Sequence, residues 1–140
     1  MTAIYTMAAM LAVLAALASA AASGAQARNV DIGMFDTMRF SPSKLTVERG
    51  ETIRFTVRNE GKLRHEIVIG TEDEIAHHRH AMQQESGMAH EAPNMAHVAP
   101  GKRGHLTWQF DDPGQLAFAC LLPGHYEAGM HGTITVLPNP

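Results

Sequence analysis

The sequence has only one cysteine, little net charge and no internal repeat. A single cysteine in 140 residues cannot form a disulfide within the chain, so the fold depends on its packed core. The formal net charge of −3 argues against nucleic-acid binding through bulk electrostatics. A chain of this length without repeats predicts one domain. The chain does have nine histidines and nine methionines, and their positions carry most of the functional information.

The N-terminal segment has the features of a secretory signal. Residues 7–22 are almost entirely Ala, Leu, Met and Val, and residues 25–27 then form an A-x-A cleavage site. No Lys or Arg precedes the apolar run, a departure from the usual pattern, and no cysteine follows it to carry a lipid. The alternative, a membrane anchor, needs about 20 apolar residues and is disfavoured by the shorter run. We expect residues 1–27 to be a signal peptide cleaved near Ala27, and residues 28–140 to form the exported domain.

Short stretches of alternating apolar and polar residues predict an all-β fold. In residues 52–57, for example, Ile53, Phe55 and Val57 share one face. Turn residues such as those at 111–114 (DDPG) separate the stretches, which is typical of an antiparallel sandwich. The predicted strands cover residues 30–35, 38–40, 45–47, 52–57, 65–69, 105–110, 116–120 and 132–137.

One helical insertion interrupts the strands at about residues 71–100. Thr71 is followed three residues later by Glu74, which predicts a capping box at a helix N-terminus. The acidic residues 72–74 also suit the positive end of the helix dipole. We therefore expect a helix over residues 72–85, followed by a loop over residues 86–100, which contain Gly and Pro.

The stretch from Cys120 to Met130 (CLLPGHYEAGM) combines a thiol, an imidazole and a thioether at C-x₄-H-x₄-M spacing. Its Gly and Pro content predicts a loop, which can direct Cys120, His125 and Met130 at one point. With a second histidine from elsewhere, these donors make the His₂Cys trigonal set with a weak axial Met that binds electron-transfer copper. The alternative is that the cysteine is a small buried apolar residue and the methionine fills the core.

This loop resembles the ligand loop of the cupredoxins, the family of plastocyanin, azurin and rusticyanin. Over roughly residues 30–137 the chain resembles more closely the small periplasmic cupredoxins of the CopI type, which are linked to copper tolerance. The segments that carry the resemblance are HEIVIGT, WQF and CLLPGHYEAGM. The resemblance implies a Greek-key β-sandwich, a periplasmic location and one type 1 copper. It also implies that Asn59 hydrogen-bonds around the cysteine sulfur.

The resemblance identifies His65 as the second histidine ligand. Cupredoxins carry a histidine at a strand end after a turn, far in sequence from the C-terminal loop, and His65 matches that position. The predicted copper ligands are therefore His65, Cys120, His125 and Met130. On its own, His65 is equally well interpreted as a surface histidine. His105 is the other candidate, but its neighbours in an alternating strand indicate solvent, so we treat it as a non-ligand.

A second group of histidines and methionines lies in the insertion. On a helix, His78 and Met82 share a face at i and i+4, and His77 and His80 are at i and i+3. Imidazole and thioether groups bind both Cu(I) and Cu(II), so the segment is a candidate for a second, exchangeable copper site. Equally, it is a solvated helix whose methionines fill the base of the sandwich. The candidate residues are His77, His78, His80, Met82, Met88, His90, Met95 and His97.

These features favour a periplasmic protein that binds copper and contributes to copper tolerance. The alternative is an electron-transfer cupredoxin, which would use an apolar patch around His125 formed by residues 121–123. A copper oxidase or nitrite reductase needs a further catalytic copper and usually several domains, so we do not expect an enzyme. The expected partners are a copper ion and a periplasmic redox or copper-handling protein, without nucleic acid or, after signal cleavage, a membrane. We expect a monomer.

Overall fold

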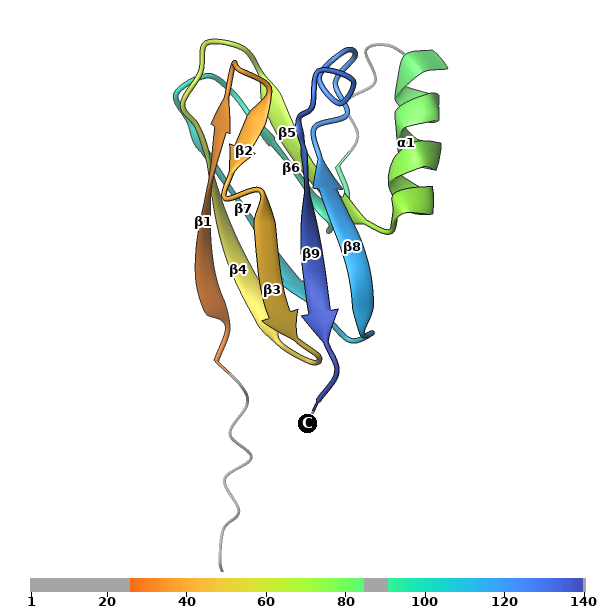
Figure 1. Ribbon diagram of the computed structural model, residues 1–140. Coiled ribbons are helices and arrows are strands. Elements are labelled where there is room, and N and C mark those ends of the chain that lie inside the picture. The colour runs from red at the N-terminus through yellow and green to blue at the C-terminus, as the bar shows by residue number, and fades with distance from the viewer. Residues whose placement is uncertain (1–25, 85–90, 140) are drawn as a thin grey trace, which may run out of the picture.

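The computed structural model describes residues 26–84 and 91–139, which form a sandwich of two β-sheets (Figure 1). The first sheet has the strand order β2-β1-β4-β7 and the second has the order β3-β9-β8-β5-β6. The strands are β1 (Arg28–Phe35), β2 (Arg39–Ser41), β3 (Lys44–Glu48), β4 (Thr52–Asn59), β5 (His65–Gly70), β6 (Met95–Val98), β7 (Arg103–Gln109), β8 (Gly114–Ala119) and β9 (His131–Leu137). The predicted sandwich is therefore confirmed.

Alternating side chains build the core between the sheets. In β4, Ile53, Phe55 and Val57 are fully buried, as the sequence pattern predicts, and in β9 Ile134 and Val136 are buried. The pairs β1–β4 and β3–β9 are parallel and the other neighbouring strands are antiparallel, so the sheets are mixed and the prediction of an antiparallel sandwich is wrong for these two pairs. The main apolar cluster includes residues of both sheets and extends to Cys120 and Met130. The ligand loop is thus anchored in the core.

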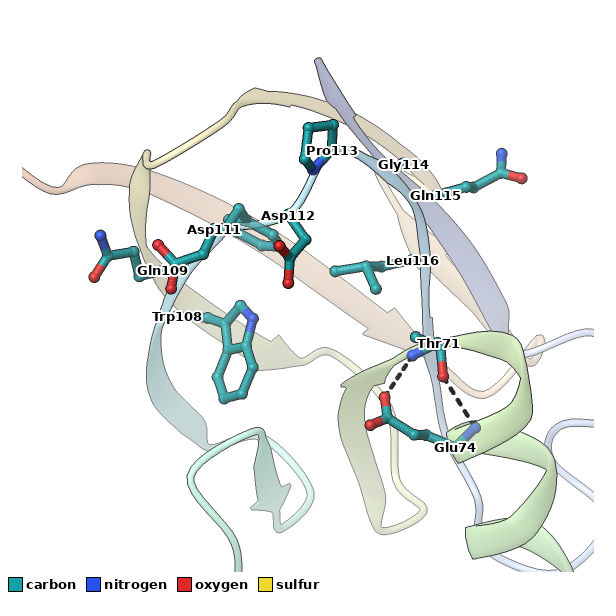
Figure 2. Close-up of a pocket in the computed structure, with 11 residues that line it drawn as sticks. Thr71, Glu74, Trp108, Gln109, Asp111, Asp112, Pro113, Gly114, Gln115 and Leu116 are labelled. Carbon is teal, nitrogen blue, oxygen red and sulfur yellow. Dashed lines mark hydrogen bonds between the residues drawn. The ribbon is translucent and has the colours of Figure 1, made fainter. Parts of the chain in front are cut away.

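Helix α1 (Glu72–Gln84) lies against the outer face of the second sheet, where it contacts β5 and β8 (Figure 1). The predicted capping box is present, because the Thr71 N–H donates to Oε2 of Glu74 at 2.8 Å and the Glu74 N–H donates to Oγ1 of Thr71 at 3.2 Å (Figure 2). The helix buries Ile75 and Met82. The predicted helix is confirmed as far as Gln84; residue 85 lies outside the described residues. Within the described part of the chain, no helix is long and apolar enough to cross a membrane.

The expectation of a loop over residues 86–100 is wrong for residues 95–98, and its residues 86–90 lie outside the described residues. Residues Met95–Val98 form strand β6, which pairs antiparallel with β5 at the edge of the second sheet. The strand is only four residues long and lies between Pro93 and Pro100, so its alternation was too short to recognise. The pairing matters for function because it places His97 opposite Glu66, the residue after His65.

Candidate metal centre

Strand ends at one end of the second sheet bring the predicted ligands together. His65 begins β5, Cys120 follows the last residue of β8, and Met130 precedes the first residue of β9. Because β8 pairs antiparallel with both β5 and β9, these three strand ends lie at the same end of the sheet. His125 lies in the connection between β8 and β9. Figure 1 shows this connection at the same end as the β1–β2 turn and the β4–β5 connection.

The loop that carries three of the ligands is closed by backbone hydrogen bonds. The Cys120 N–H donates to the Met130 carbonyl at 3.0 Å, and the Met130 N–H donates to the His125 carbonyl at 3.0 Å. Gly124 and Gly129 have φ angles of 84° and 103°, left-handed values that favour glycine. These tight turns hold residues 120, 125 and 130 close together.

The side chains of His65, Cys120 and His125 converge on one point. One potential ligand atom from each residue lies within 4.8 Å of the other two. Nδ1 of His125 is 3.3 Å from Sγ of Cys120 and 3.3 Å from Nδ1 of His65. His65, Cys120 and Met130 are fully buried, whereas His125 is half-buried. The site therefore has a buried interior and a single, more exposed imidazole.

Burial governs protonation at this site. Burial raises the pKa of the Cys120 thiol to about 12, although backbone N–H groups of Glu66 and Leu122 act in the opposite direction. Burial also lowers the pKa of His125, and the neighbouring His65 adds to this effect. At neutral pH the pocket therefore offers a neutral thiol and a neutral imidazole. A metal ion must displace the thiol proton when it binds.

A buried carboxylate lies behind the sulfur. The backbone N–H of Glu66, a fully buried residue, donates to Sγ of Cys120 at 3.4 Å. Its side-chain Oε1 accepts a hydrogen bond from the Leu121 N–H at 3.0 Å, and its Oε2 is 3.0 Å from Nδ1 of His97. Glu66 thus contacts both the sulfur and the peptide that follows Cys120, and it fixes their orientation relative to β5.

A second carboxylate contacts His65 from the other side of the ring. Nε2 of His65 is 2.9 Å from Oδ1 of Asp36, which lies between β1 and β2. The N–H groups of Lys62 and Leu63 donate to the same carboxylate at 2.7 and 3.2 Å. The Lys62 hydrogen bond is the main cause of the lowered pKa of Asp36. With Nε2 occupied by Asp36, it is Nδ1 of His65 that faces the other ligands.

These donors fit copper. One thiol and two imidazoles, with a buried thioether on the same loop, form the soft and intermediate donor set of electron-transfer copper sites. The family model of copper binding proteins of the plastocyanin/azurin family matches residues 27–137. The chain belongs to this family. The resemblance inferred from the ligand loop is thereby confirmed.

This cupredoxin is similar to proteins named for copper resistance. It is 46% identical over 109 residues to the copper-resistant cuproprotein CopI of Rubrivivax gelatinosus, and the aligned segment covers 78% of this chain and 66% of that relative. It is 38% identical over 144 residues to the copper-resistant cuproprotein CopI of Pseudomonas aeruginosa, with coverage of 81% and 79%. The chain thus spans slightly less than two thirds of the Rubrivivax protein. Dithionite-reduced auracyanin from Roseiflexus castenholzii has a TM-score of 0.68 and 27% identity, over 80% of this chain and 98% of the auracyanin.

The methionines of the predicted second copper site have a packing role where the structure describes them. Met82 on α1 and Met95 on β6 are 9% and 7% exposed. Both belong to the smaller apolar cluster between α1 and the second sheet, together with Val68, Ile75, Ala119 and Leu121. They are therefore packing residues, as the alternative held, but they lie between α1 and the outer face of the second sheet and do not fill the base of the sandwich. Met88 lies outside the described residues.

The histidines of that predicted site do not converge. His77 and His80 are exposed on α1, and His78 is half-buried on the same helix. His97 pairs with Glu66 instead. His90 lies outside the described residues. Among the residues that the structure describes, His65, Cys120 and His125 form the only group of this kind close enough to hold one ion, so a second copper site is not supported.

Two further expectations concerned His105 and Asn59. His105 is exposed on β7, and its Nδ1 is 3.4 Å from Oγ1 of Thr56, so it takes no part in the cluster. The expectation that Asn59 hydrogen-bonds around the Cys120 sulfur is wrong, because its side chain contacts backbone groups instead. Its side-chain nitrogen donates to the carbonyls of Leu63 and Val98, and its oxygen accepts from the Gly61 N–H. Asn59 therefore shapes the turn before His65.

Sequence reasoning missed Asp36 and Glu66. Glu66 left a signal, because it is a single charged residue in the apolar run HEIVIG, and all six residues of β5 are buried. A carboxylate at such a position needs a partner inside the protein. Asp36 left no comparable signal, since an acidic residue in a turn is ordinary.

A groove of about 350 Å³ lies away from this centre, at the turn between β7 and β8 (Figure 2). Trp108 and Leu116 line it together with three acidic residues, Glu74, Asp111 and Asp112. The Glu74 carboxylate already accepts the Thr71 N–H in the capping box, and Figure 2 shows both hydrogen bonds. The groove therefore adds no chemistry to the metal centre.

Proposed function

We propose that this cupredoxin binds one copper ion in a type 1 site and contributes to copper tolerance. The observation that carries the proposal is the convergence of one ligand atom from each of His65, Cys120 and His125 within 4.8 Å. These residues would supply the trigonal ligands, and the Met130 thioether the weak axial ligand. The names of the relatives from Rubrivivax and Pseudomonas support the role in tolerance.

The chain's own residues prepare the site. Copper held by such mixed donors can alternate between Cu(I) and Cu(II) with little rearrangement. The fully buried His65, Cys120 and Met130 exclude water, and the Glu66 N–H supports the sulfur at 3.4 Å. The thiol proton leaves when metal binds, because Cys120 binds metal as the thiolate. We assign no catalytic reaction to this centre.

The proposal includes export to the periplasm and cleavage near Ala27. It is supported by the apolar run and the A-x-A site of residues 1–27, which lie outside the described residues except for the last two. Expression of the full chain in a bacterium, followed by fractionation and N-terminal sequencing, tests it. A mature protein that begins at Arg28 in the periplasmic fraction is expected, and an uncleaved chain in the membrane fraction would contradict it.

The absorption spectrum of the copper-loaded protein tests the site. We expect an intense thiolate-to-copper band in the parent protein, and this band should disappear in Cys120→Ser. A copper-loaded parent protein that shows no such band would refute a type 1 site.

The role in tolerance needs a second test, in a copper-sensitive bacterium that lacks its own gene for such a protein. Expression of the parent should restore growth on copper, and Cys120→Ser should not. Equal growth on copper with the parent and with Cys120→Ser would show that tolerance does not depend on the copper site.

Electron transfer is the alternative function, and one feature favours it. His125 is the half-buried ligand, and of the apolar patch expected over residues 121–123 only the exposed Pro123 and the half-buried Leu122 are accessible, because Leu121 is buried under α1. Such an apolar margin around an accessible ligand suits contact with a redox partner. Fast electron self-exchange of the copper protein, together with unchanged growth on copper when the gene is deleted, would favour this alternative.

A further inference from the structure

We propose that Asp36 is a positioning residue of the copper site, which holds His65 in its metal-binding tautomer and favours Cu(II) over Cu(I). The inference rests on the proposed copper-binding function and extends it to the control of the redox state. Asp36 itself would not touch the metal. It would act through the imidazole ring of His65.

The geometry fixes which nitrogen of His65 carries the proton. Oδ1 of Asp36 lies 2.9 Å from Nε2, so the ring donates its Nε2–H to the carboxylate. In a neutral imidazole the lone pair is then on Nδ1. Nδ1 is the atom that faces His125, at 3.3 Å from its Nδ1. Asp36 thus selects the tautomer in which His65 can bind an ion held between the two imidazoles.

The carboxylate is held firmly for this role. Three donors reach it, namely the backbone N–H groups of Lys62 and Leu63 and the ring of His65. Gly61 makes room for it, because a Cβ at that position would come within 1.9 Å of Oδ1 of Asp36. The β4–β5 connection therefore provides both the donors and the space. This arrangement matches the carboxylate–histidine–metal arrangement in which an outer carboxylate orients a ligand and makes it more basic.

The electrostatic consequence favours the more highly charged ion. A negative charge on the far side of the imidazole increases the electron density at Nδ1, which stabilises Cu(II) more than Cu(I). The Asp36 side chain is 35% exposed, so solvent screens part of this effect. Loss of an outer-shell partner typically weakens metal affinity by about 10–100-fold. With a screened carboxylate we expect about a tenfold loss of Cu(II) affinity relative to Cu(I), which corresponds to a rise in reduction potential of about 59 mV for one electron.

The central experiment compares Asp36→Asn with the matched control Asp31→Asn. Both substitutions remove one negative charge from the same region of the chain, but Asp31 lies on β1 and pairs with Arg58 at 3.1 Å, with 65% of its side chain exposed. The reduction potential of the copper-loaded protein and the Cu(II) affinity are measured for the parent and both variants. Asp36→Asn should raise the potential and weaken Cu(II) binding about tenfold, whereas Asp31→Asn should change neither measurably. Equal potentials in the two variants would overturn the proposal.

A second variant keeps the charge and moves the carboxylate. In Gly61→Ala the new methyl group forces the Asp36 side chain away from its present position. The potential should rise in the same direction as in Asp36→Asn. This variant answers the question even if Asp36→Asn fails to fold. A potential equal to that of the parent in Gly61→Ala would show that contact with His65 is not what matters.

A measurement without copper separates this inference from the proposed function. Nitrogen NMR of the histidine rings in the copper-free protein should show His65 protonated at Nε2 in the parent. An Asp36→Ala variant, which removes the acceptor of the Nε2–H, should show a mixture of tautomers. An unchanged Nε2–H tautomer in the variant would refute the positioning role even if copper binding is intact. Conversely, a parent that shows the expected tautomer but binds no copper would refute the proposed function alone.

Discussion

Replacement of Glu66 by alanine is expected to destabilise the copper-free protein by about 3 kcal/mol. The Leu121 N–H, which donates to Oε1 of Glu66 at 3.0 Å, would remain buried without an acceptor, a cost of about 1–3 kcal/mol. Loss of the partner of His97, at 3.0 Å, adds to this. The His97 side chain is 20% exposed, so solvent replaces part of this lost contact, and we place the total at about 3 kcal/mol, the upper limit for the unpaired N–H alone.

Two further variants separate the contributions. Glu66→Gln keeps an amide oxygen for the Leu121 N–H, so it should cost only about 1–2 kcal/mol, from the loss of a charge-assisted hydrogen bond. Asp31→Ala is the control for an exposed ion pair, which contributes at most about 1 kcal/mol. Urea unfolding of the three copper-free variants at pH 7, with the slope of the transition checked for constancy, gives the free energies of unfolding. If the free energy of unfolding falls no more in Glu66→Ala than in Asp31→Ala, the buried Glu66 carboxylate does not stabilise the contact between β5 and the ligand loop.

Three other predictions test the site and the insertion. Because burial raises the pKa of the Cys120 thiol to about 12, copper must displace one proton when it binds below that pH. The apparent copper affinity should therefore rise about tenfold per pH unit between pH 7 and 9. A competition assay that gives the same affinity across this pH range would contradict the prediction. Met130→Leu preserves the volume of a fully buried side chain and should cost less than about 1.5 kcal/mol in urea unfolding, yet it should change the absorption spectrum; an unchanged spectrum would remove Met130 from the ligands. Thr71→Ala removes the acceptor of the Glu74 N–H and should cost about 1 kcal/mol with a loss of helical circular dichroism, whereas full retention of both would show that the capping box does not hold α1.

The features that could be predicted from the sequence are those encoded in short stretches. The loop from Cys120 to Met130 contains three potential metal ligands within eleven residues. The alternation of apolar and polar residues in β4 places Ile53, Phe55 and Val57 on one face. The capping box of α1 is likewise local. His65 was identified through the family resemblance, because its distance from Cys120 along the chain gives no local signal.

The features that could not be predicted depend on contacts between distant segments. Asp36 meets His65 only because the β1–β2 turn and the β4–β5 connection lie at one end of the sandwich. His97 became a candidate metal ligand because imidazoles bind metals, but the pairing of β6 with β5 places it opposite Glu66. Composition alone therefore left open whether the insertion holds a second metal site or only packs against the sheet. It could not show which imidazoles were already occupied by carboxylates.

The position of β9 determines when the copper site can exist. This last strand lies in the interior of its sheet, with β3 on one side and β8 on the other, and it directly follows Met130. A nascent chain that still lacks residues 131–137 has a gap between β3 and β8, and the loop from Cys120 to Met130 is anchored to the sheet only through β8. We therefore expect the four predicted ligands to be held in place only after the last strand has been added to the sheet.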